Sequence, residues 1–271
     1  AGTDDGNVQR TVDGGTTGTA LTETFPGLPE LTSSSRLLAS RFDRQRVYAT
    51  FDGHQQDDTA PYVYASDDAG DTWRSITVGL PDWSVNVIAE HHRNEDLLFL
   101  GNELGLYFSL DRGTSWEQLK NNLPTVPVDD IIVHPRDNDL IIGTHGRSVW
   151  ILDNISTLEN LATARAARSP YLFPVKRATL FNDLPRNTYA GAAEFWAPNP
   201  PPGAVIDYLL AEDAPGEEGE PTITVAIIRP DGTTIRTLSG SGSIGLQSVE
   251  WDLRTNPPFP AEDAKQLALP P

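Results

Sequence analysis

The stretch Ser109–Trp116, which reads SLDRGTSW, decides the fold of this chain. A near copy, Ser66–Trp73 (SDDAGDTW), lies upstream, and both follow the pattern Ser-x-Asp-x-Gly-x-Ser/Thr-Trp. The Asp carboxylate can accept hydrogen bonds from nearby backbone N–H groups, the Gly can adopt a positive φ, and the hydroxyls bond locally. The Trp would bury a large apolar area beneath the turn. Each copy therefore predicts a β-hairpin corner fastened by its own side chains.

The residues that we assign to this structural role are Ser66, Asp68, Gly70, Thr72, Trp73, Ser109, Asp111, Gly113, Ser115 and Trp116. A weaker third copy, Thr11–Gly18 (TVDGGTTG), ends in Gly18 where the others have Trp. The Asp corners at 13, 68 and 111 are 55 and 43 residues apart. A repeat of about 40–50 residues that holds four short strands is typical of a β-propeller blade.

Residues 1–154 are expected to form part of such a propeller, with about three to four blades. Residues 2–22 are interpreted as the tail of one blade. Two four-stranded blades and three strands of a further blade follow, with predicted strands at 36–40, 46–52, 62–66, 73–78, 85–91, 96–101, 106–110, 116–120, 130–134, 140–144 and 148–152. The pattern then stops.

Ser156–Glu159 (STLE) reads as a capping box, and a short helix is predicted to run from there to about Ala166. Residues 155–185 are interpreted as a helical linker and junction. Residues 186–255 predict a small β-sandwich of immunoglobulin type, and 256–271 an extended tail. The strands predicted for the sandwich are 193–196, 205–211, 222–229, 234–238 and 247–253. The fold class is thus all-β with one short helix.

The composition excludes several classes of protein. The 271 residues carry a formal charge of −18, from 38 acidic and 20 basic side chains, and contain no cysteine. A surface of this charge disfavours nucleic acid as a partner, because phosphate contacts need basic side chains. No run approaches the roughly 18 apolar residues of a membrane span, so direct membrane insertion is not expected. Residue 1 is Ala, which suggests a processed chain or an interior piece of a longer one.

The repeated corner resembles the Asp-box, or BNR repeat, of sialidases, other propeller glycosidases and sortilin-type receptors. Residues 134–153 (HPRDNDLIIGTHGRSVWILD) are similar to the end of the propeller region in exported bacterial proteins of the sortilin-like, glycosyl-hydrolase-like family. The resemblance implies a periplasmic or extracellular C-terminal portion in which a helix and a sandwich follow the propeller. Family members carry more blades upstream and a longer sandwich.

The candidate ligand or channel residues are few. Propeller glycosidases use two carboxylates across a cleft, and Asp129 and Asp130, a paired carboxylate near a strand start, are the candidates for that role, although a solvated loop is the commoner one. His145 and Arg147 share a turn that could line the propeller channel. The five histidines lack zinc-site spacing, so neither a metal nor another cofactor is expected.

Three functions follow from these observations. The first is a non-catalytic scaffold or partner-binding protein, such as a peripheral extracytoplasmic subunit of a larger, membrane-bound assembly. Three-odd blades cannot close a ring, so missing blades, a second copy or a protein partner must cover the open blade edges. The second is a glycoside hydrolase or a carbohydrate-binding remnant, with a glycan as ligand. The third is a sortilin-like peptide binder. The lack of a recognisable catalytic set favours a role other than catalysis.

Overall fold

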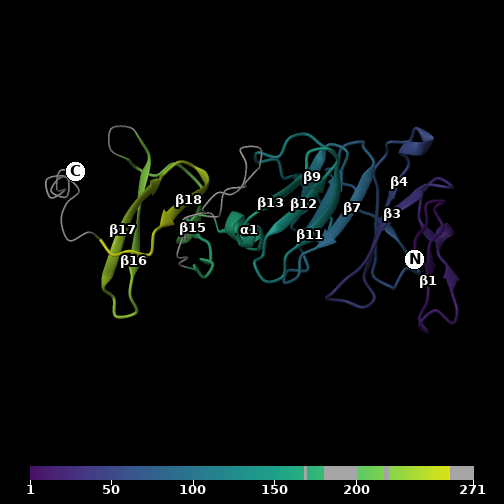
Figure 1. Ribbon diagram of the computed structural model, residues 1–271, viewed down its shortest axis with the longest axis horizontal. Helices are drawn as coiled ribbons and strands as arrows, with labels where there is room; N and C mark the ends of the chain where they lie inside the picture. The colour runs from purple at the N-terminus through teal and green to yellow at the C-terminus, as the bar shows by residue number, and fades with distance from the viewer. Residues whose placement is uncertain (168–169, 180–200, 217–219, 257–271) are drawn as a thin grey trace, which may run out of the picture. The chain divides into compact units, whose positions relative to one another are not determined.

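The structure is a computed structural model that describes residues 1–167, 170–179, 201–216 and 220–256 (Figure 1). Strands dominate it, and the chain divides into two compact units, residues 1–159 and 160–271. Each unit is described by itself below. The all-β class and the partial propeller predicted from the sequence are confirmed by the sheets of the first unit.

Two complete blades lie in the middle of the first unit, and both are antiparallel meanders. Blade A contains β3 (Ser33–Ala39), β4 (Val47–Asp52), β5 (Tyr62–Ser66) and β6 (Arg74–Ser75). Blade B contains β7 (Val85–Glu90), β8 (Leu98–Asn102), β9 (Gly105–Ser109) and β10 (Glu117–Gln118). The outer strands are shorter than predicted. After β6 the chain turns to the next blade, where the carbonyl of Val78 accepts a bond from the N–H of Trp116.

Incomplete sheets flank these two blades. Blade C has three strands, β11 (Val128–Val133), β12 (Leu140–Thr144) and β13 (Val149–Leu152). The half-blade at the other end pairs β1 (Gln9–Arg10) with β2 (Thr19–Ala20). Short 3₁₀ turns, η1 (Thr22–Thr24) and η2 (His54–Gln56), lie in the loops. The blades follow one another along the chain, as Figure 1 shows for β3, β7 and β11.

Adjacent blades pack face to face through alternating side chains. Blade A contributes Tyr48, Val63 and Ala65 to a buried cluster in which Ile88 and Leu98 of blade B take part. Because successive residues of a strand point to opposite faces, the neighbours of Ile88 and Leu98 in β7 and β8 point toward blade C. Each complete blade is therefore apolar on both faces, which is typical of sheets covered on both sides.

The three inner strands share a β-bulge at the same position. The register shifts between Ser34 and Arg36 in β3, between Val85 and Val87 in β7, and between Val128 and Asp130 in β11. The extra residues of the bulges are Ser35, Asn86 and Asp129. All three are polar, and a bulge re-aims side chains at the end of a strand.

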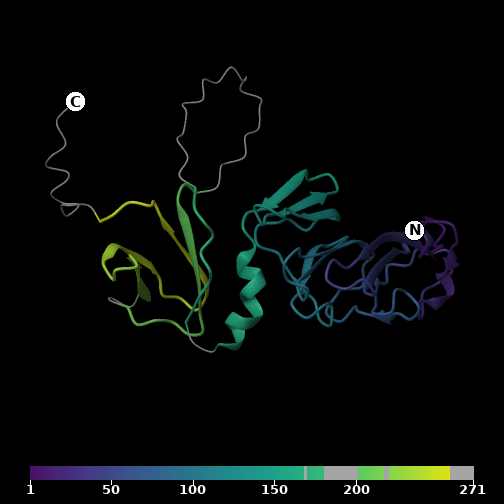
Figure 2. The same cartoon turned by 90° about the horizontal axis from the view of Figure 1, so that it is seen from below.

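Helix α1 (Ser156–Ala166) follows blade C and confirms the predicted short helix (Figure 2). The second unit contains a three-stranded sheet, β14 (Tyr171–Leu172), β15 (Ala204–Leu210) and β18 (Gly245–Trp251), and the pair β16 (Thr222–Ile228) and β17 (Thr234–Ser241). The immunoglobulin-type sandwich and the predicted domain boundaries stay predictions. The expected strand at 193–196 and almost all of the tail at 256–271 lie outside the described residues.

Candidate functional site

The two Asp-box corners have the same hydrogen bonds. Asp111 accepts bonds from the Ser109 hydroxyl at 2.7 Å, from the Ser115 hydroxyl at 2.6 Å and from the Ser115 N–H at 2.9 Å. The N–H of Gly113 donates to the Ser109 hydroxyl at 2.8 Å, with φ at +82°. Equivalent bonds join Asp68 to Ser66 and Thr72. Each carboxylate thus accepts three bonds from inside its own turn.

This bonding favours the ionised form of the corner carboxylates. The hydroxyl and the backbone N–H of Thr72 lower the pKa of Asp68 to about 2. The same two groups of Thr17 lower the pKa of Asp13 to about 2 in the third corner. A general acid needs a pKa near the working pH, so Asp68 and Asp13 do not fit that role.

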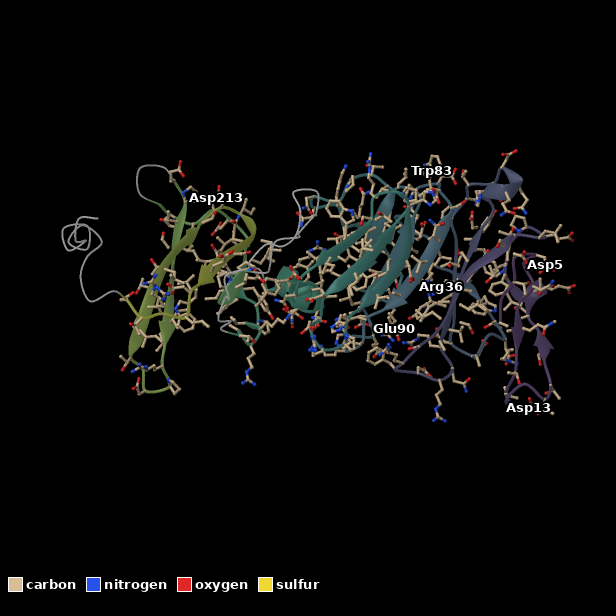
Figure 3. All side chains as sticks on the ribbon, viewed as in Figure 1. Asp5, Asp13, Arg36, Trp83, Glu90 and Asp213 are labelled. Atoms are coloured by element: carbon tan, nitrogen blue, oxygen red, sulfur yellow. The ribbon has the colours of Figure 1, made fainter. Side chains whose placement is uncertain are left out.

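The tryptophan of each corner packs onto the preceding blade. The Trp116 indole is buried and donates a bond of 2.7 Å to the carbonyl of Ile76 in blade A. A Cβ placed on Gly113 would lie 2.7 Å from Cδ1 of the same Ile76. The third corner, labelled at Asp13 in Figure 3, lacks this arrangement. A Cβ on Gly15 would meet no described atom within 4 Å.

We expect Asp111→Ala to lower the melting temperature by about 4 °C, because three hydrogen bonds of a blade-to-blade corner are lost together. Differential scanning fluorimetry measures this change. The matched control is Asp13→Ala, which removes the same kinds of bond from a corner that has Gly18 in place of the packed tryptophan, and it should have a smaller effect. Equal effects of the two variants would contradict the role of blade packing.

The sequence suggested the pairs Asp129–Asp130 and His145–Arg147, but the contacts in the structure are different. His145 Nδ1 lies 3.4 Å from Asp129 Oδ2, and Asp130 forms an ion pair with Arg36 of blade A. Both aspartates are about half exposed, at 50% and 53%. Arg147 lies on the exposed turn, where its backbone carbonyl accepts a bond from the Trp150 indole. Each carboxylate thus faces a group that carries or can carry positive charge, and a ligand role for these four residues stays a prediction.

Blade C exposes an apolar face whose equivalent in blade B is buried. Cross-strand pairs place Ile132 beside Ile141, Ile141 beside Ile151, and Gly143 beside Val149, so these five residues share one face, the open face of blade C. Ile132, Val149 and Ile151 are 53%, 62% and 59% exposed.

The residues at the equivalent positions of blade B are buried against a neighbouring blade. Phe99, Leu106 and Phe108 occupy the places of Ile141, Val149 and Ile151 in the strand register, and all three are buried. In blade B this surface is covered by blade C, since β11 packs on β7 and β8.

Two glycines make the comparison quantitative. Gly101 of β8 and Gly143 of β12 hold the same register position. A Cβ on Gly101 would lie 2.6 Å from the backbone oxygen of Val128 in blade C, whereas the atom nearest to a Cβ on Gly143 would be Asp130 Cβ, at 3.6 Å. Strand β11 therefore packs closely against Gly101, whereas no strand of the described residues packs in the same way against Gly143.

A buried polar cluster that the sequence did not reveal ties blades B and C to helix α1. His91 is fully buried, and its Nε2 lies 2.9 Å from Asn138 Oδ1 and 3.1 Å from Glu159 Oε1. Its Nδ1 accepts bonds from the backbone N–H groups of Arg93 and Asn94. One sequence feature could have indicated the role of His91. His134 follows β11 as His91 follows β7, and the Nδ1 atoms of both rings accept hydrogen bonds from backbone N–H groups of the following turn.

The two ends of blade B differ in character. Trp83, which is 43% exposed, precedes β7, and Glu90 ends that strand at the opposite end of the blade (Figure 3). Glu90 is buried and accepts bonds from the Ser40 hydroxyl at 2.7 Å and the Arg41 N–H at 2.8 Å. One end therefore holds polar groups between blades, and the other presents an exposed aromatic ring.

The described residues contain no helix that is both long and apolar enough to span a bilayer. In the same part of the chain, no three His, Asp or Glu side chains gather as they would around a metal ion.

Residues 61–163 match the family model described as Sortilin, neurotensin receptor 3 (Sortilin-Vps10). No curated protein is significantly similar to the sequence. Among solved structures, a GH74 xyloglucanase from Xanthomonas campestris is 14% identical, with a TM-score of 0.36, over 51% of this chain and 23% of the enzyme. An ancestral GH74 enzyme is 13% identical, with a TM-score of 0.36, over 87% of this chain and 31% of that one.

A structure described as YCF48 bound to D1 peptide is 13% identical, with a TM-score of 0.41, over 94% of this chain and 74% of that chain. The chain spans about a quarter to a third of the length of the two GH74 structures. The repeated corners, the stacked blades and the family match together identify the blades of this chain as part of an Asp-box β-propeller, similar over residues 61–163 to the sortilin family.

Proposed function

We propose that this chain is a non-catalytic, partner-binding scaffold whose open face of blade C is covered by a β-sheet of another polypeptide. The observation that carries the proposal is the difference between two equivalent surfaces. Phe99, Leu106 and Phe108 are buried in blade B, whereas Val149 and Ile151 stay exposed at two of the same positions in blade C. Exposed apolar patches of this kind mark interaction sites.

Burying the exposed apolar side chains of this face would contribute favourable free energy to binding. Ile132, Val149 and Ile151 are each more than half exposed. Burying a side chain of this type fully is worth about 1.5–3 kcal/mol, so completing the burial of three would contribute roughly 3 kcal/mol. The free edge of β13 adds unpaired backbone groups at the rim, because β13 pairs only with β12 in the described sheet.

An extracytoplasmic location belongs to this proposal. It is supported by the resemblance of residues 134–153 to exported bacterial proteins, where such a chain would act as a peripheral subunit of a larger assembly. The glycoside hydrolase alternative gains no support from Asp129 and Asp130, since Asp130 already forms an ion pair with Arg36 and Asp129 lies beside the His145 ring. The peptide-binding alternative, through His145 and Arg147, stays a prediction.

The absence of cysteine allows a direct test. Val149→Cys introduces a single thiol on the open face, and Val87→Cys introduces one on the covered face of blade B, where Val87 is 1% exposed. We expect iodoacetamide to alkylate the first thiol much faster than the second in the native full-length chain at low concentration. Equal protection of both thiols would mean that the chain covers its own face, and the proposal would fail.

A further inference from the structure

We infer that a surface around Trp83 binds a basic segment, rich in Arg or Lys, of a partner protein. The Trp83 surface consists of Asp58, Asp82, Trp83 and Glu103. It lies at the end of blades A and B opposite to the end that holds the Asp-box corners, the corner end (Figure 3). The inference goes beyond the proposed function, because it concerns a second surface and does not depend on the open face of blade C.

Trp83 is exposed at a position where the neighbouring blades have smaller, buried side chains. It stands three residues before the bulge residue Asn86, and Thr32 and Val126 stand three residues before the bulge residues of blades A and C. Thr32 and Val126 are 3% and 5% exposed, whereas Trp83 is 43% exposed. Since blade B lies between blades A and C, this exposure does not come from an unpaired blade. The exposed part of the indole is therefore open to a partner.

Ser84, the neighbour of Trp83, connects two loops that carry carboxylates. Its hydroxyl oxygen lies 3.5 Å from the backbone oxygen of Asp58, in the loop between β4 and β5. Its own backbone oxygen accepts a bond of 3.4 Å from the N–H of Glu103, in the turn between β8 and β9. Asp82 is exposed and directly precedes Trp83. Three carboxylates thus come from three different segments next to one exposed ring.

The basic side chains of blades A and B gather at the other end. From β3 to β10 the chain contains no Lys, and Arg36 pairs with blade C. The other arginines of this stretch lie in or next to the loops of the corner end: Arg41, Arg44, Arg46, Arg74, Arg93 and Arg112. Within the described residues, no ion pair joins Asp58, Asp82 or Glu103 to a Lys or Arg. The Trp83 surface therefore carries negative charge that complements a basic partner.

A tryptophan ring beside carboxylates is suited to bind a guanidinium or ammonium group. The ring face attracts the cation, and Trp does so better than Tyr or Phe. The carboxylates accept its N–H groups in charge-assisted hydrogen bonds. Phe42 is exposed to almost the same extent, 42%, but Arg41 precedes it and Arg44 follows in the same loop, so that ring is not a cation site. The formal charge of −18 adds attraction at long range.

The experiment titrates the full-length chain into a fluorescein-labelled peptide of alternating Arg and Gly and follows fluorescence anisotropy. We expect binding that weakens as the NaCl concentration rises, because salt screens exposed charges. A peptide of the same length with Glu in place of Arg should not bind. Trp83→Ala should raise the dissociation constant by about fivefold, and Trp83→Phe by less, since Phe keeps a ring face. Asp82→Asn should raise it by about threefold.

The matched controls make the same changes at the corner end. Phe42→Ala removes a ring of nearly equal exposure, 42% against 43%. Asp96→Asn removes one negative charge from a side chain that pairs with Arg112 and is 48% exposed. Each control should leave the dissociation constant within about twofold, because distant exposed charges are screened.

Several outcomes would overturn the inference. They are no binding of the Arg peptide, equal binding of the Glu peptide, and a loss in Asp96→Asn as large as that in Asp82→Asn. Binding of cellohexaose that Trp83→Ala abolishes, without binding of the Arg peptide, would make this surface a glycan site and would overturn the inference as well. None of these results changes the expected reactivity of the Val149→Cys thiol, so this inference and the proposed function fail separately.

Discussion

Gly101→Ala is expected to destabilise the first unit by about 3 kcal/mol, although it adds a single methyl group. The new Cβ would lie 2.6 Å from both the backbone oxygen and Cγ1 of Val128, and 2.8 Å from Cγ1 of Val87. Because the oxygen belongs to the backbone of β11, relieving that contact requires blade C to move away from blade B, and the contact with Val87 strains blade B itself. Urea unfolding followed by tryptophan fluorescence measures the change.

The equivalent glycine of blade C provides the control for this variant. Gly143→Ala makes the same change at the same register position of blade C, where the nearest atom is Asp130 Cβ at 3.6 Å. We expect a change within about 1 kcal/mol, since only the backbone freedom of the unfolded chain is affected. If both variants cost the same, the close packing of blade C on Gly101 is not a feature of the protein in solution.

His91→Ala is expected to cost about 3–4 kcal/mol of unfolding free energy. The imidazole is fully buried, so its loss leaves a cavity. It also removes the acceptor of the hydrogen bonds that the backbone N–H groups of Arg93 and Asn94 donate. It also removes the ring N–H that faces Asn138 and Glu159. Buried polar groups without partners are costly, so several penalties coincide.

The matched control is His134→Ala. That ring accepts a bond from the N–H of Asp137, as His91 does in its own turn, but its side chain is 37% exposed and water can replace the bond. The cost should be about 1 kcal/mol. A loss for His134→Ala as large as that for His91→Ala would contradict the importance of the buried cluster.

The same cluster sets a pH dependence. Burial lowers the pKa of His91, and Nδ1 already accepts two backbone bonds, so the neutral ring with its proton on Nε2 is the form that fits. Burial also lowers the pKa of the adjacent His92. An unfolded histidine titrates near about pH 6.5, so below that pH the unfolded chain takes up protons that the folded chain refuses.

The stability that these histidines contribute is therefore present in full above about pH 6.5 and is lost as the pH falls. We expect the urea midpoint to decrease between about pH 7.5 and about pH 5.5, and to decrease less in His91→Gln. A midpoint that does not change over this interval would contradict a neutral buried His91.

Local pattern was enough to predict the Asp-box corners and most of the strands. Ser109, Asp111, Gly113 and Ser115 interact with one another within seven residues, so their geometry follows from sequence order alone. The alternation of side chains along a strand depends on the backbone in the same local way. The strands of blades A, B and C, and helix α1, were predictable for this reason.

The open face and the buried cluster could not be predicted in this way. His91 meets Asn138 and Glu159 across 47 and 68 residues of sequence, and nothing near His91 encodes those partners. The apolar residues of β12 and β13 read like those of β8 and β9, yet Phe108 is buried and Ile151 is exposed. Sequence determined which residues of this protein are apolar and where its corners turn. The tertiary structure alone decided which apolar face stays uncovered, because burial depends on whether another sheet packs there, and that contact is not local.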